Sequence, residues 1–481
     1  HSPAAGAPGR SSALAAGVPS SPEVFMRQAW SLALVFAFSG VILFLGAAQA
    51  SAQAPEADHP VRALPIKSIA AIDQVWSGHK VGFALAAGPK RIYVGYYDAS
   101  RQLTIAQRDR AGSAWTYVRL DTWLGWDSHN YIAMAIDPAG QLHVMANMHS
   151  EPLIYFRTSG TDDARDLQRR PNMIAPDDES RVTYPVFLHG ADGRLVVKYR
   201  SGRSGSGDEI YNVFDPSTDT WRRLLDAPLA SGEGQRNAYF VGPVLGPDKM
   251  FHIVWVWRDS PDASTNHDLS YARSRDLIHW ERSDGVPLVL PITLGQAEIV
   301  DPVRVRGGMI NNNTVLGFDS ADRPIVTYHK FDAAGDTQIY LARREAAGWR
   351  SVQVSRWKGF RWDFSGAGSL AGRVQVGAVR PLGGGRLVVP VVRDGRSLEL
   401  MVDEASLTFV EERPVAGLAD QMAARYPPSV DMRLNVLPLS IGPAENYALA
   451  WATRPPNRDR PTEDIPAPTT LRLVELQAPR P

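Results

Sequence analysis

From residue 66 onward, short apolar runs alternate with polar turns, and no long stretch has the spacing of an amphipathic helix. One unit recurs along this pattern. A strand leads into a polar turn, a second strand follows, and a third strand ends in an aromatic or aliphatic pair and a charge. Turns rich in Gly, Asp and Pro mark seven copies, which begin near residues 86, 137, 190, 246, 319, 381 and 441.

The copies lie 51 to 73 residues apart, which is about the length of chain that a four-stranded blade needs. The pattern therefore predicts an all-β chain folded as a seven-bladed β-propeller over residues 66–479, with no second domain. A pair of β-sandwiches and a β-helix are the alternatives. Two biased segments, 200–208 (Gly/Ser) and 453–468 (Pro/Arg/Asp), are predicted to be loops of the propeller.

The N-terminal part has a different composition and is predicted to lie outside this fold. Residues 1–25 are rich in Ala, Ser, Gly and Pro and resemble a leader segment. Residues 26–52 hold a positive charge, the apolar run "WSLALVFAFSGVILFLGAA" and a small-residue cleavage site, which is typical of a signal peptide, and residues 53–65 form a linker. We therefore expect a periplasmic or secreted bacterial protein with no stable membrane anchor after signal cleavage.

Charge and cysteine content narrow the classes of partner. Lys plus Arg and Asp plus Glu both number 51, so no basic excess indicates binding to nucleic acid or to an anionic membrane. The chain has no Cys, which excludes disulfides and a lipidated cysteine.

Three of the eleven histidines fall within "DSHNYIAMAIDPAGQLHVMANMHSEPLIYF". If "QLHVMANMH" is one strand, His143 and His149 lie about 20 Å apart and cannot share a ligand. His129 begins the preceding antiparallel strand, so the turn at "DPAG" returns the chain and brings His129 and His149 to the same rim. His143 is predicted to be structural. No H-x-H or H-E-x-x-H spacing supplies a third zinc ligand, so we expect no metal and favour catalysis.

The next copies add polar residues at the same rim. Tyr184 starts one strand and Arg200 ends its hairpin partner, and Arg258 lies at a strand end in the following copy. Asn266 and His267 come shortly after it. An Arg at a single strand end is more often an ordinary surface residue. The prediction that Arg200 and Arg258 belong to a site depends on their equivalent positions at strand ends.

A Tyr with His and Arg residues favours abstraction of the proton next to a sugar carboxylate, followed by β-elimination. The cations would neutralise the carboxylate and stabilise the developing enolate. Tyr or His would transfer protons, with Arg200 expected to lower the pKa of Tyr184. The pair of acidic residues that most glycosidases use is not evident at this rim.

The stretches "HNYIAMAIDPAGQLHVMANMH", "TYP…YR", "WVWRD", "NHDLSYARSRD" and "VTYHKFD" resemble the BNR-repeat-like propellers that include ulvan lyases and rhamnose–glucuronate lyases. The separations match that family: 20 residues from His129 to His149 and 16 from Tyr184 to Arg200. The resemblance implies proton transfer by Tyr184, with His129 as a second acid or base. It also implies that His149 and Arg200 stabilise the site and that Arg258 holds the uronate carboxylate.

Further substrate contacts are expected from Asn266, His267, His329 and Trp126, the last by stacking on a sugar ring. No cofactor is required for this chemistry. Some relatives hold a calcium ion, which this sequence neither supports nor excludes, and some hold a zinc with a cysteine ligand that is absent here.

The expected partner is a uronic-acid-containing polysaccharide or oligosaccharide, cleaved by a lyase. The alternatives are an α-L-rhamnosidase on a rhamnose–glucuronate linkage and a non-catalytic sugar-binding propeller. A sialidase is the weaker alternative, because "SRDLIHW" is only a degenerate Asp-box.

Overall fold

A computed structural model describes residues 65–442 and 445–477. The leader, the signal peptide and all but the last residue of the linker expected from the sequence lie outside this part of the chain. All described residues belong to one compact unit, residues 47–481. None of the helices within the described residues is long and apolar enough to cross a bilayer.

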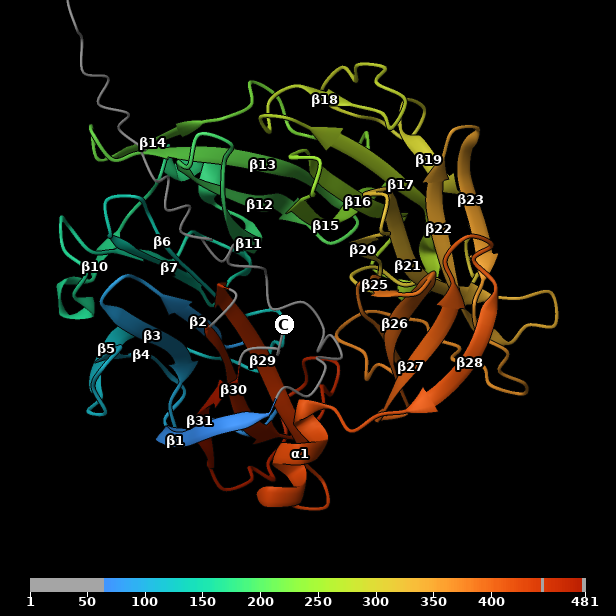
Figure 1. The fold of residues 1–481 in the computed structure, drawn as a ribbon. Helices are drawn as coiled ribbons and strands as arrows, with labels where there is room; N and C mark the ends of the chain where they lie inside the picture. The colour runs from blue at the N-terminus through green and yellow to red at the C-terminus, as the bar shows by residue number, and fades with distance from the viewer. Residues whose placement is uncertain (1–64, 443–444, 478–481) are drawn as a thin grey trace, which may run out of the picture. The chain divides into compact units, whose positions relative to one another are not determined.

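Seven antiparallel sheets follow one another around a common centre, so the all-β, seven-bladed propeller is confirmed (Figure 1). Sheets one to four consist of β2 (Ala84–Ala87), β3 (Arg91–Tyr97), β4 (Gln102–Asp109) and β5 (Thr116–Trp123); β6 (Ile132–Ile136), β7 (Leu142–Ala146), β9 (Tyr155–Arg157) and β10 (Gln168–Arg170); β8 (His149–Glu151), β11 (Val182–His189), β12 (Leu195–Arg203), β13 (Ser206–Asp215) and β14 (Thr220–Arg223); and β15 (Asn237–Leu245), β16 (Phe251–Arg258), β17 (Asn266–Ser274), β18 (Trp280–Glu281) and β19 (Glu298–Asp301).

The remaining three sheets follow the same plan. They consist of β20 (Val315–Phe318), β21 (Pro324–Phe331), β22 (Thr337–Glu345) and β23 (Gly348–Gln353); β24 (Val374–Val376), β25 (Arg380–Gly383), β26 (Arg386–Arg393), β27 (Arg396–Asp403) and β28 (Phe409–Pro414); and β29 (Arg433–Gly442), β30 (Glu445–Thr453), β31 (Thr469–Leu476) and β1 (Ile66–Val75). Each of the seven polar turns identified in the sequence joins the first and second long strands of one sheet.

The ring is closed by the two ends of the described chain. The N-terminal strand β1 pairs with β31 and forms the outer edge of the last sheet, with Val75 opposite Thr469. The one α-helix of the described residues, α1 (Leu418–Arg425), precedes this sheet and packs on β29. The turn pattern in the sequence does not predict this pairing, because it joins segments about 400 residues apart.

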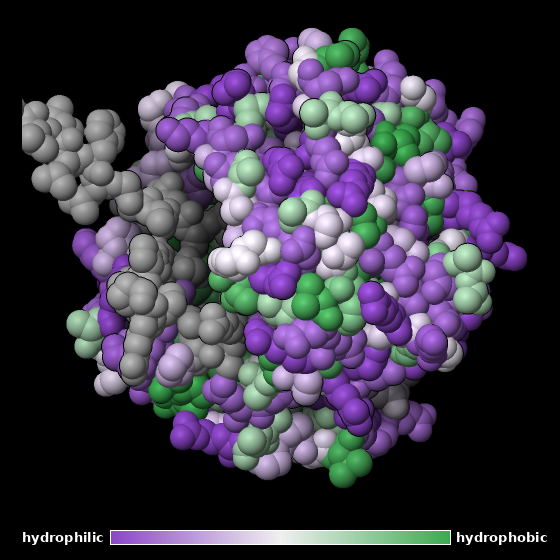
Figure 2. Space-filling model, turned by 45° about the vertical axis from the view of Figure 1, so that its right-hand side comes forward, coloured by the Kyte–Doolittle hydropathy of each residue, from purple (hydrophilic) through white to green (hydrophobic). Residues whose placement is uncertain are grey.

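The middle strands form the core and the outer strands face water. Every residue of β16 is buried, and this strand reads as the nearly continuous apolar run "FHIVWVW". The outer strand β5 is mostly exposed and alternates between exposed and buried positions from Arg119 to Trp123. Strands covered on both faces lose the alternation of apolar and polar residues. Strands in this chain are therefore marked either by continuous apolar runs or by alternation. On the outer surface, small apolar patches are scattered among hydrophilic residues (Figure 2).

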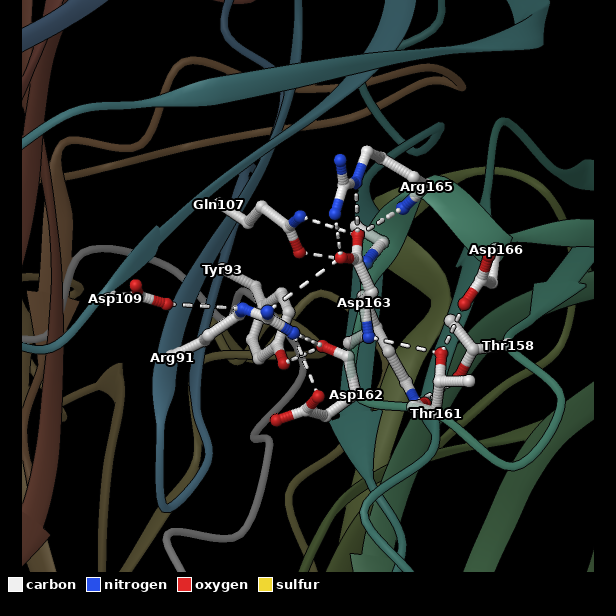
Figure 3. A network of polar contacts seen from close by, with 12 residues as sticks. Arg91, Tyr93, Gln107, Asp109, Thr158, Thr161, Asp162, Asp163, Arg165 and Asp166 are labelled. Carbon is white, nitrogen blue, oxygen red and sulfur yellow. Dashed lines mark hydrogen bonds and ion pairs between the residues drawn. The ribbon is translucent and has the colours of Figure 1, made fainter.

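Polar contacts join sheets one and two at the end of the sheets where the second strands begin. Arg91, at the start of β3, donates through Nη1 to Oδ1 of Asp162 at 2.8 Å. Gln107 donates to Oδ1 of Asp163 at 2.7 Å, and the hydroxyl of Tyr93 donates to the carbonyl of Asp162 (Figure 3). Each of these polar groups already has a hydrogen-bond partner within the protein. We therefore regard this network as a structural link between sheets one and two.

Two local expectations from the sequence are wrong. The stretch "QLHVMANMH" is not one strand, because Asn147 has a positive φ of 62° and ends the pairing of sheet two. His149 instead begins β8, which pairs with β11 in sheet three. Segment 200–208 is not a loop, since β12 and β13 run through it as a hairpin with Arg203 opposite Ser206. Segment 453–468 is a loop between β30 and β31, as expected.

Candidate active site

Two imidazoles lie side by side where sheets two and three meet. His129, in the turn before β6, and His149, at the start of β8, have ring centres 4.2 Å apart. Each Nδ1 donates to a different oxygen of Asp127, at 2.7 Å for His129 and 2.5 Å for His149. A carboxylate on Nδ1 fixes the tautomer, so the neutral rings present an unprotonated Nε2 away from Asp127.

Asp127 remains ionised in this arrangement. Burial acts to raise its pKa, but the hydrogen bonds and charges of His129 and His149 outweigh burial and hold the pKa below its usual value. The sequence analysis did not single out Asp127. The only indication in the sequence was that Asp127 lies two residues before His129. Its contact with His149 depends on how the loop folds, which the sequence pattern does not show.

Tyr184 lies next to the imidazoles because the backbone of β11 is locally irregular. The pairing of β11 with β12 shifts between Thr183 and Val186, and Tyr184 has a positive φ of 56°. A bulge of this kind redirects a side chain, and a non-glycine residue in this conformation is held by its surroundings. The ring of Tyr184 lies 5.9 Å from that of His129, measured between centres.

Arg200 is a buried cation with no acidic partner among the described residues. Arg200 is only 2% exposed, and its Cζ lies 5.0 Å from the centre of the Tyr184 ring. Nη2 donates to the hydroxyls of Thr183 at 3.0 Å and Ser150 at 3.3 Å. Nε and Nη1 have no partner within the described part of the chain. A buried guanidinium in this state can bind an anion without first breaking an ion pair.

Sheet four repeats the Tyr–Arg arrangement. Tyr239 is the third residue of β15, as Tyr184 is of β11, and Cζ of Arg258 lies 5.4 Å from the Tyr239 ring centre. The two tyrosine rings are 6.3 Å apart between centres, so the two Tyr–Arg pairs lie next to each other. Sequence analysis missed Tyr239, although its equivalent position in the next copy of the repeat was a usable signal.

The two guanidinium groups differ in what holds them. Arg258 donates to the carbonyls of Ser260, at 3.0 Å, and Pro261, and its Nη1 donates to Oδ1 of Asn311 at 3.3 Å. All three acceptors are neutral. Arg258 is thus oriented by the chain, whereas Arg200 retains two unpartnered nitrogens.

The phenols have pKa values displaced in opposite directions. Burial raises the pKa of Tyr184, and Arg200 acts to lower this pKa, as expected from the sequence, but by less than burial raises it. Burial also acts to raise the pKa of Tyr239, but Arg258 and Arg200 together outweigh it and lower the pKa. The two guanidinium groups thus favour the ionised form of Tyr239, which is 3% exposed, while burial favours the neutral form of Tyr184.

The other residues expected to contact substrate lie in different places. Asn266 is directly opposite Arg258 in the pairing of β16 and β17, and its Nδ2 donates to the carbonyl of Ala263 at 2.7 Å. His267 is held between Asp259, at 3.0 Å, and Asp268, at 2.8 Å. Burial acts to lower the pKa of His267, and the two acids reverse this and raise it.

His329 and Trp126 belong to aromatic packing. His329 is 1% exposed, its ring centre lies 5.2 Å from that of Trp362, and burial lowers its pKa to about 4. No described contact links it to the tyrosines. The half-buried Trp126 packs against Trp76 at 5.4 Å between centres, with the guanidinium of Arg101 over its ring.

His143 lies in the core of sheet two. It is fully buried, with Nδ1 2.7 Å from the Tyr155 hydroxyl and Nε2 3.4 Å from Oδ2 of Asp137. His252 has an equivalent Tyr271 hydroxyl partner in sheet four, which indicates a structural element of the repeat.

The Asp127 carboxylate and the two imidazoles also form a potential metal site. One ligand atom from each of Asp127, His129 and His149 lies within 4.8 Å of the others. The sequence suggested that a third ligand was missing, and Asp127 supplies one. In the present arrangement both Nδ1 atoms are engaged with the carboxylate, so a metal ion on the same atoms would have to displace both hydrogen bonds.

A second carboxylate fixes the loop that carries His129. Oδ1 of Asp459 accepts hydrogen bonds from the backbone of Ser128 at 3.0 Å and from the hydroxyl of Ser369 at 2.6 Å. Oδ2 of Asp459 lies 3.7 Å from Nδ1 of His129. Segments from three distant parts of the chain thus meet beside the imidazole pair.

Comparison with known proteins agrees with the fold and with the resemblance seen in the sequence. Residues 91–357 match the family described as "BNR repeat-containing family member". The ulvan lyase, long isoform, of Glaciecola sp. (strain KUL10) is 28% identical over 67 residues, which cover 14% of this chain and 7% of that protein. The ulvan lyase, short isoform, of Alteromonas sp. (strain LOR) is 23% identical over 166 residues, covering 34% of this chain and 30% of that protein.

Solved structures are similar over a larger share of the chain. Polysaccharide lyase Uly1 has a TM-score of 0.60 at 12% identity and covers 86% of this chain and 100% of its own. A PL25 ulvan lyase has a TM-score of 0.57 at 14% identity, covering 85% and 95%. The same kind of lyase has been solved bound to -[GlcA(1-4)Rha3S]-, with a TM-score of 0.56. At these identities the likeness establishes the fold.

Proposed function

Because the chain belongs to the BNR repeat-containing family, we propose that it is a polysaccharide lyase that cleaves a uronate-containing glycan by β-elimination. The observation that carries the proposal is the buried Arg200, which has no acidic partner among the described residues and lies 5.0 Å from the ring of Tyr184, next to the Tyr239–Arg258 pair. An elimination next to a carboxylate needs an anion site, a base and an acid in one place. Arg200, Tyr239 and Tyr184 supply these three groups.

The first step in this mechanism is neutralisation of the uronate carboxylate. Arg200 would donate to the carboxylate through its unpartnered Nε and Nη1, which are buried and must be uncovered as the substrate binds. Withdrawal of charge onto the guanidinium makes the C5 proton more acidic and stabilises the enolate that forms when the proton leaves. The resemblance assigned this task to Arg258, but Arg258 already donates to three oxygen acceptors, and it fits better as the group that orients and charges the pocket around Tyr239.

Tyr239 then removes the C5 proton as a phenolate, and Tyr184 donates its proton to the glycosidic oxygen at C4. The C5–H electron pair forms the C4–C5 double bond as the C4–O bond breaks, so one end becomes an unsaturated uronate and the other a free hydroxyl. Proton exchange with solvent then returns Tyr239 to the phenolate and Tyr184 to the phenol. His129 remains a second acid or base through Nε2, and His149 stabilises it through their shared carboxylate.

The substrate class follows from the relatives and from the charge of the site. The related proteins are ulvan lyases, and one was solved with a glucuronate–rhamnose-3-sulfate repeat. We infer a rhamnose- and uronate-containing polysaccharide or oligosaccharide as substrate, with ulvan as the polymer to test first. No nucleic acid partner is proposed, since the chain carries no net charge.

The proposed mechanism uses no metal or other cofactor, because Asp127 engages both Nδ1 atoms and Arg200 neutralises the substrate carboxylate. We also propose export to the periplasm or beyond, on the basis of the signal-peptide pattern in residues 26–52.

Incubation of the purified protein with ulvan, followed by ultraviolet absorbance of the unsaturated uronate, tests the proposal. A rise that is lost in Tyr239→Phe supports elimination at this site. Release of free rhamnose without a rise would establish the α-L-rhamnosidase instead. Saturable binding of ulvan with neither product would establish a sugar-binding propeller.

A further inference from the structure

Residues 365–369, in the loop between β23 and β24, link two turns that carry site residues, and we call them the connecting segment. Near its start, the amide of Gly366 donates to Oδ1 of Asp262 at 2.7 Å. At its end, the amide of Ser369 donates to Oδ2 of Asp459 at 3.0 Å, and the hydroxyl of Ser369 donates to Oδ1 at 2.6 Å. Each end of the connecting segment is therefore held by one carboxylate.

Asp262 belongs to the turn after β16 that orients Arg258, because the Arg258 side chain donates to two carbonyls of this turn. Oδ1 of Asp262 also accepts from the amide of Ser264 at 2.9 Å. The connecting segment returns a hydrogen bond to the turn, since the carbonyl of Gly366 accepts from the amide of Ala263 at 2.9 Å. The hydrogen bonds from Ser264 and Gly366 hold the pKa of Asp262 below its usual value, so its carboxylate is ionised.

Asp459 holds the turn that carries His129. Its Oδ1 accepts from the amide of Ser128 at 3.0 Å, and its Oδ2 lies 3.7 Å from Nδ1 of His129. Asp459 has a positive φ of 61°, a conformation that its surroundings must hold in a residue other than glycine. The carboxylate that binds the end of the connecting segment thus also fixes the backbone next to the imidazole.

The connecting segment fits closely against the loop that carries Asp459. Nη1 of Arg458 donates to the carbonyls of Ser365 at 3.1 Å and Ala367 at 3.3 Å. At Gly368, which has a positive φ of 82°, a Cβ atom would come within 2.9 Å of the carbonyl oxygen of Arg458. Glycine permits this approach, so the segment has a fixed place on the loop.

The shortness of the connecting segment limits how far its two ends can separate. Gly366 and Ser369 are three residues apart, so their Cα atoms cannot be more than about 11 Å from each other. The turn of Arg258 belongs to sheet four, and the turn of His129 leads into sheet two. Two groups of one active site are thereby tied together, and a displacement of about 1 Å between such groups can cost about 10²-fold in rate.

We propose that Asp262 and Asp459 act as a pair of positioning residues, which hold Arg258 and His129 in a fixed relation through the connecting segment. This inference rests on the proposed function, because it assigns the residues that place two groups of the elimination site. Neither carboxylate is assigned a contact with the substrate. Their effects on turnover are coupled, since loss of either one releases an end of the same segment.

The variants Asp262→Ala and Asp459→Asn each release one end. Asp262→Ala removes the acceptor of Gly366. Asp459→Asn keeps a residue that tolerates a positive φ, but whichever way the amide turns, its NH₂ group faces a backbone N–H, that of Ser128 or that of Ser369. Should Asp262→Ala fail to fold, Asp262→Asn, which weakens the same acceptor, is measured in its place.

Steady-state rates on ulvan test the coupling. Asp262→Ala and Asp459→Asn should each lower kcat about tenfold with little change in KM, and the double variant should also lose about tenfold rather than a hundredfold. Asp464→Asn is the matched control, because this exposed residue of the same loop accepts from Arg454 at 2.6 Å instead of from the connecting segment. It should change neither kcat nor KM. Losses that multiply in the double variant would overturn the pairing.

Hydrogen exchange of backbone amides, followed by mass spectrometry of peptides, measures the link without turnover. Asp262→Ala should accelerate exchange at Ser128 as well as at Gly366, and Asp459→Asn should accelerate it at Ser264 as well as at Ser369. Faster exchange that stays at the substituted end would overturn the proposal. An inactive wild type in which the effect still crosses the segment would refute the lyase and retain the link between the two turns.

Discussion

The imidazoles of His129 and His149 lie 4.2 Å apart because one carboxylate binds both of them. Two rings so close would repel each other if both were protonated, and the ionised Asp127 between their Nδ1 atoms offsets that repulsion. Both imidazoles also adjoin Tyr184, whose ring centre lies 5.9 Å from that of His129 and 6.4 Å from that of His149. The imidazole pair therefore acts as one unit with Asp127.

Asp127→Asn tests this coupling. An amide keeps the size of the side chain but cannot accept from both Nδ1 atoms with the strength of a carboxylate, so one imidazole loses its orientation. We expect kcat on ulvan to fall by about 10²-fold or more, with a much smaller change in KM. Asp121→Asn, an exposed position on β5, is the control. An unchanged kcat in Asp127→Asn would show that the imidazole pair is not part of the machinery.

The same carboxylate predicts a pH dependence of stability. The pKa of Asp127 is lower in the folded protein than in the unfolded chain, so the ionised form stabilises the fold. This contribution is present above the unfolded value of about 4 and is lost as the pH falls below it. Chemical unfolding from pH 6 downward should show wild type losing more stability than Asp127→Asn below pH 4. Parallel curves would contradict the assignment.

The two tyrosines are predicted to have different pH signatures. Tyr239→Phe removes the base and should abolish elimination together with the limb of kcat/KM that rises with pH. Tyr184→Phe removes the acid, so it should lower kcat by about 10²-fold and leave that rising limb in place. Steady-state rates over the pH range measure both. If Tyr184→Phe instead removes the rising limb, the two assignments must be exchanged.

Much of this arrangement could be predicted from the sequence, and the remainder depends on irregular backbone. The seven turns locate the seven sheets, and the 16-residue separation places Tyr184 near Arg200 because a hairpin returns the chain. Asn147 ends its strand with a positive φ, which strict alternation cannot reveal, so the transfer of His149 to sheet three was missed. Tyr239 was missed because its position is only informative once β15 is aligned with β11.

Arg200 is predicted to serve function at the cost of stability. It is buried without an acidic partner, so Arg200→Met should raise the melting temperature by a few degrees while abolishing turnover. Arg343 is equally buried but pairs with Glu345 at 2.7 Å, so Arg343→Met should lower the melting temperature. Calorimetry of the two variants separates these effects. Destabilisation in both would mean that the hydrogen bonds from Arg200 to Thr183 and Ser150 stabilise the fold by more than its unpaired burial destabilises it.

Metal addition and removal test the chemistry assigned to Asp127 and the imidazoles. Incubation with EDTA should leave the rate on ulvan unchanged, since no step uses a metal. Added Zn²⁺ should inhibit, because it would take the ligand atoms of Asp127, His129 and His149. The Asp127→Asn variant should bind Zn²⁺ more weakly. Loss of activity with EDTA and recovery with a divalent ion would replace this mechanism with a metal-dependent one.

Elimination itself is the central claim, and mass spectrometry of products formed from ulvan in water labelled with heavy oxygen tests it most directly. Elimination adds no solvent oxygen across the bond that breaks, so the new uronate end should carry no label and should be lighter than the hydrolysis product by one water. A saturated uronate end, with label at C1 of the other fragment above the exchange seen in an enzyme-free control, would show that the protein is a hydrolase and would contradict the account.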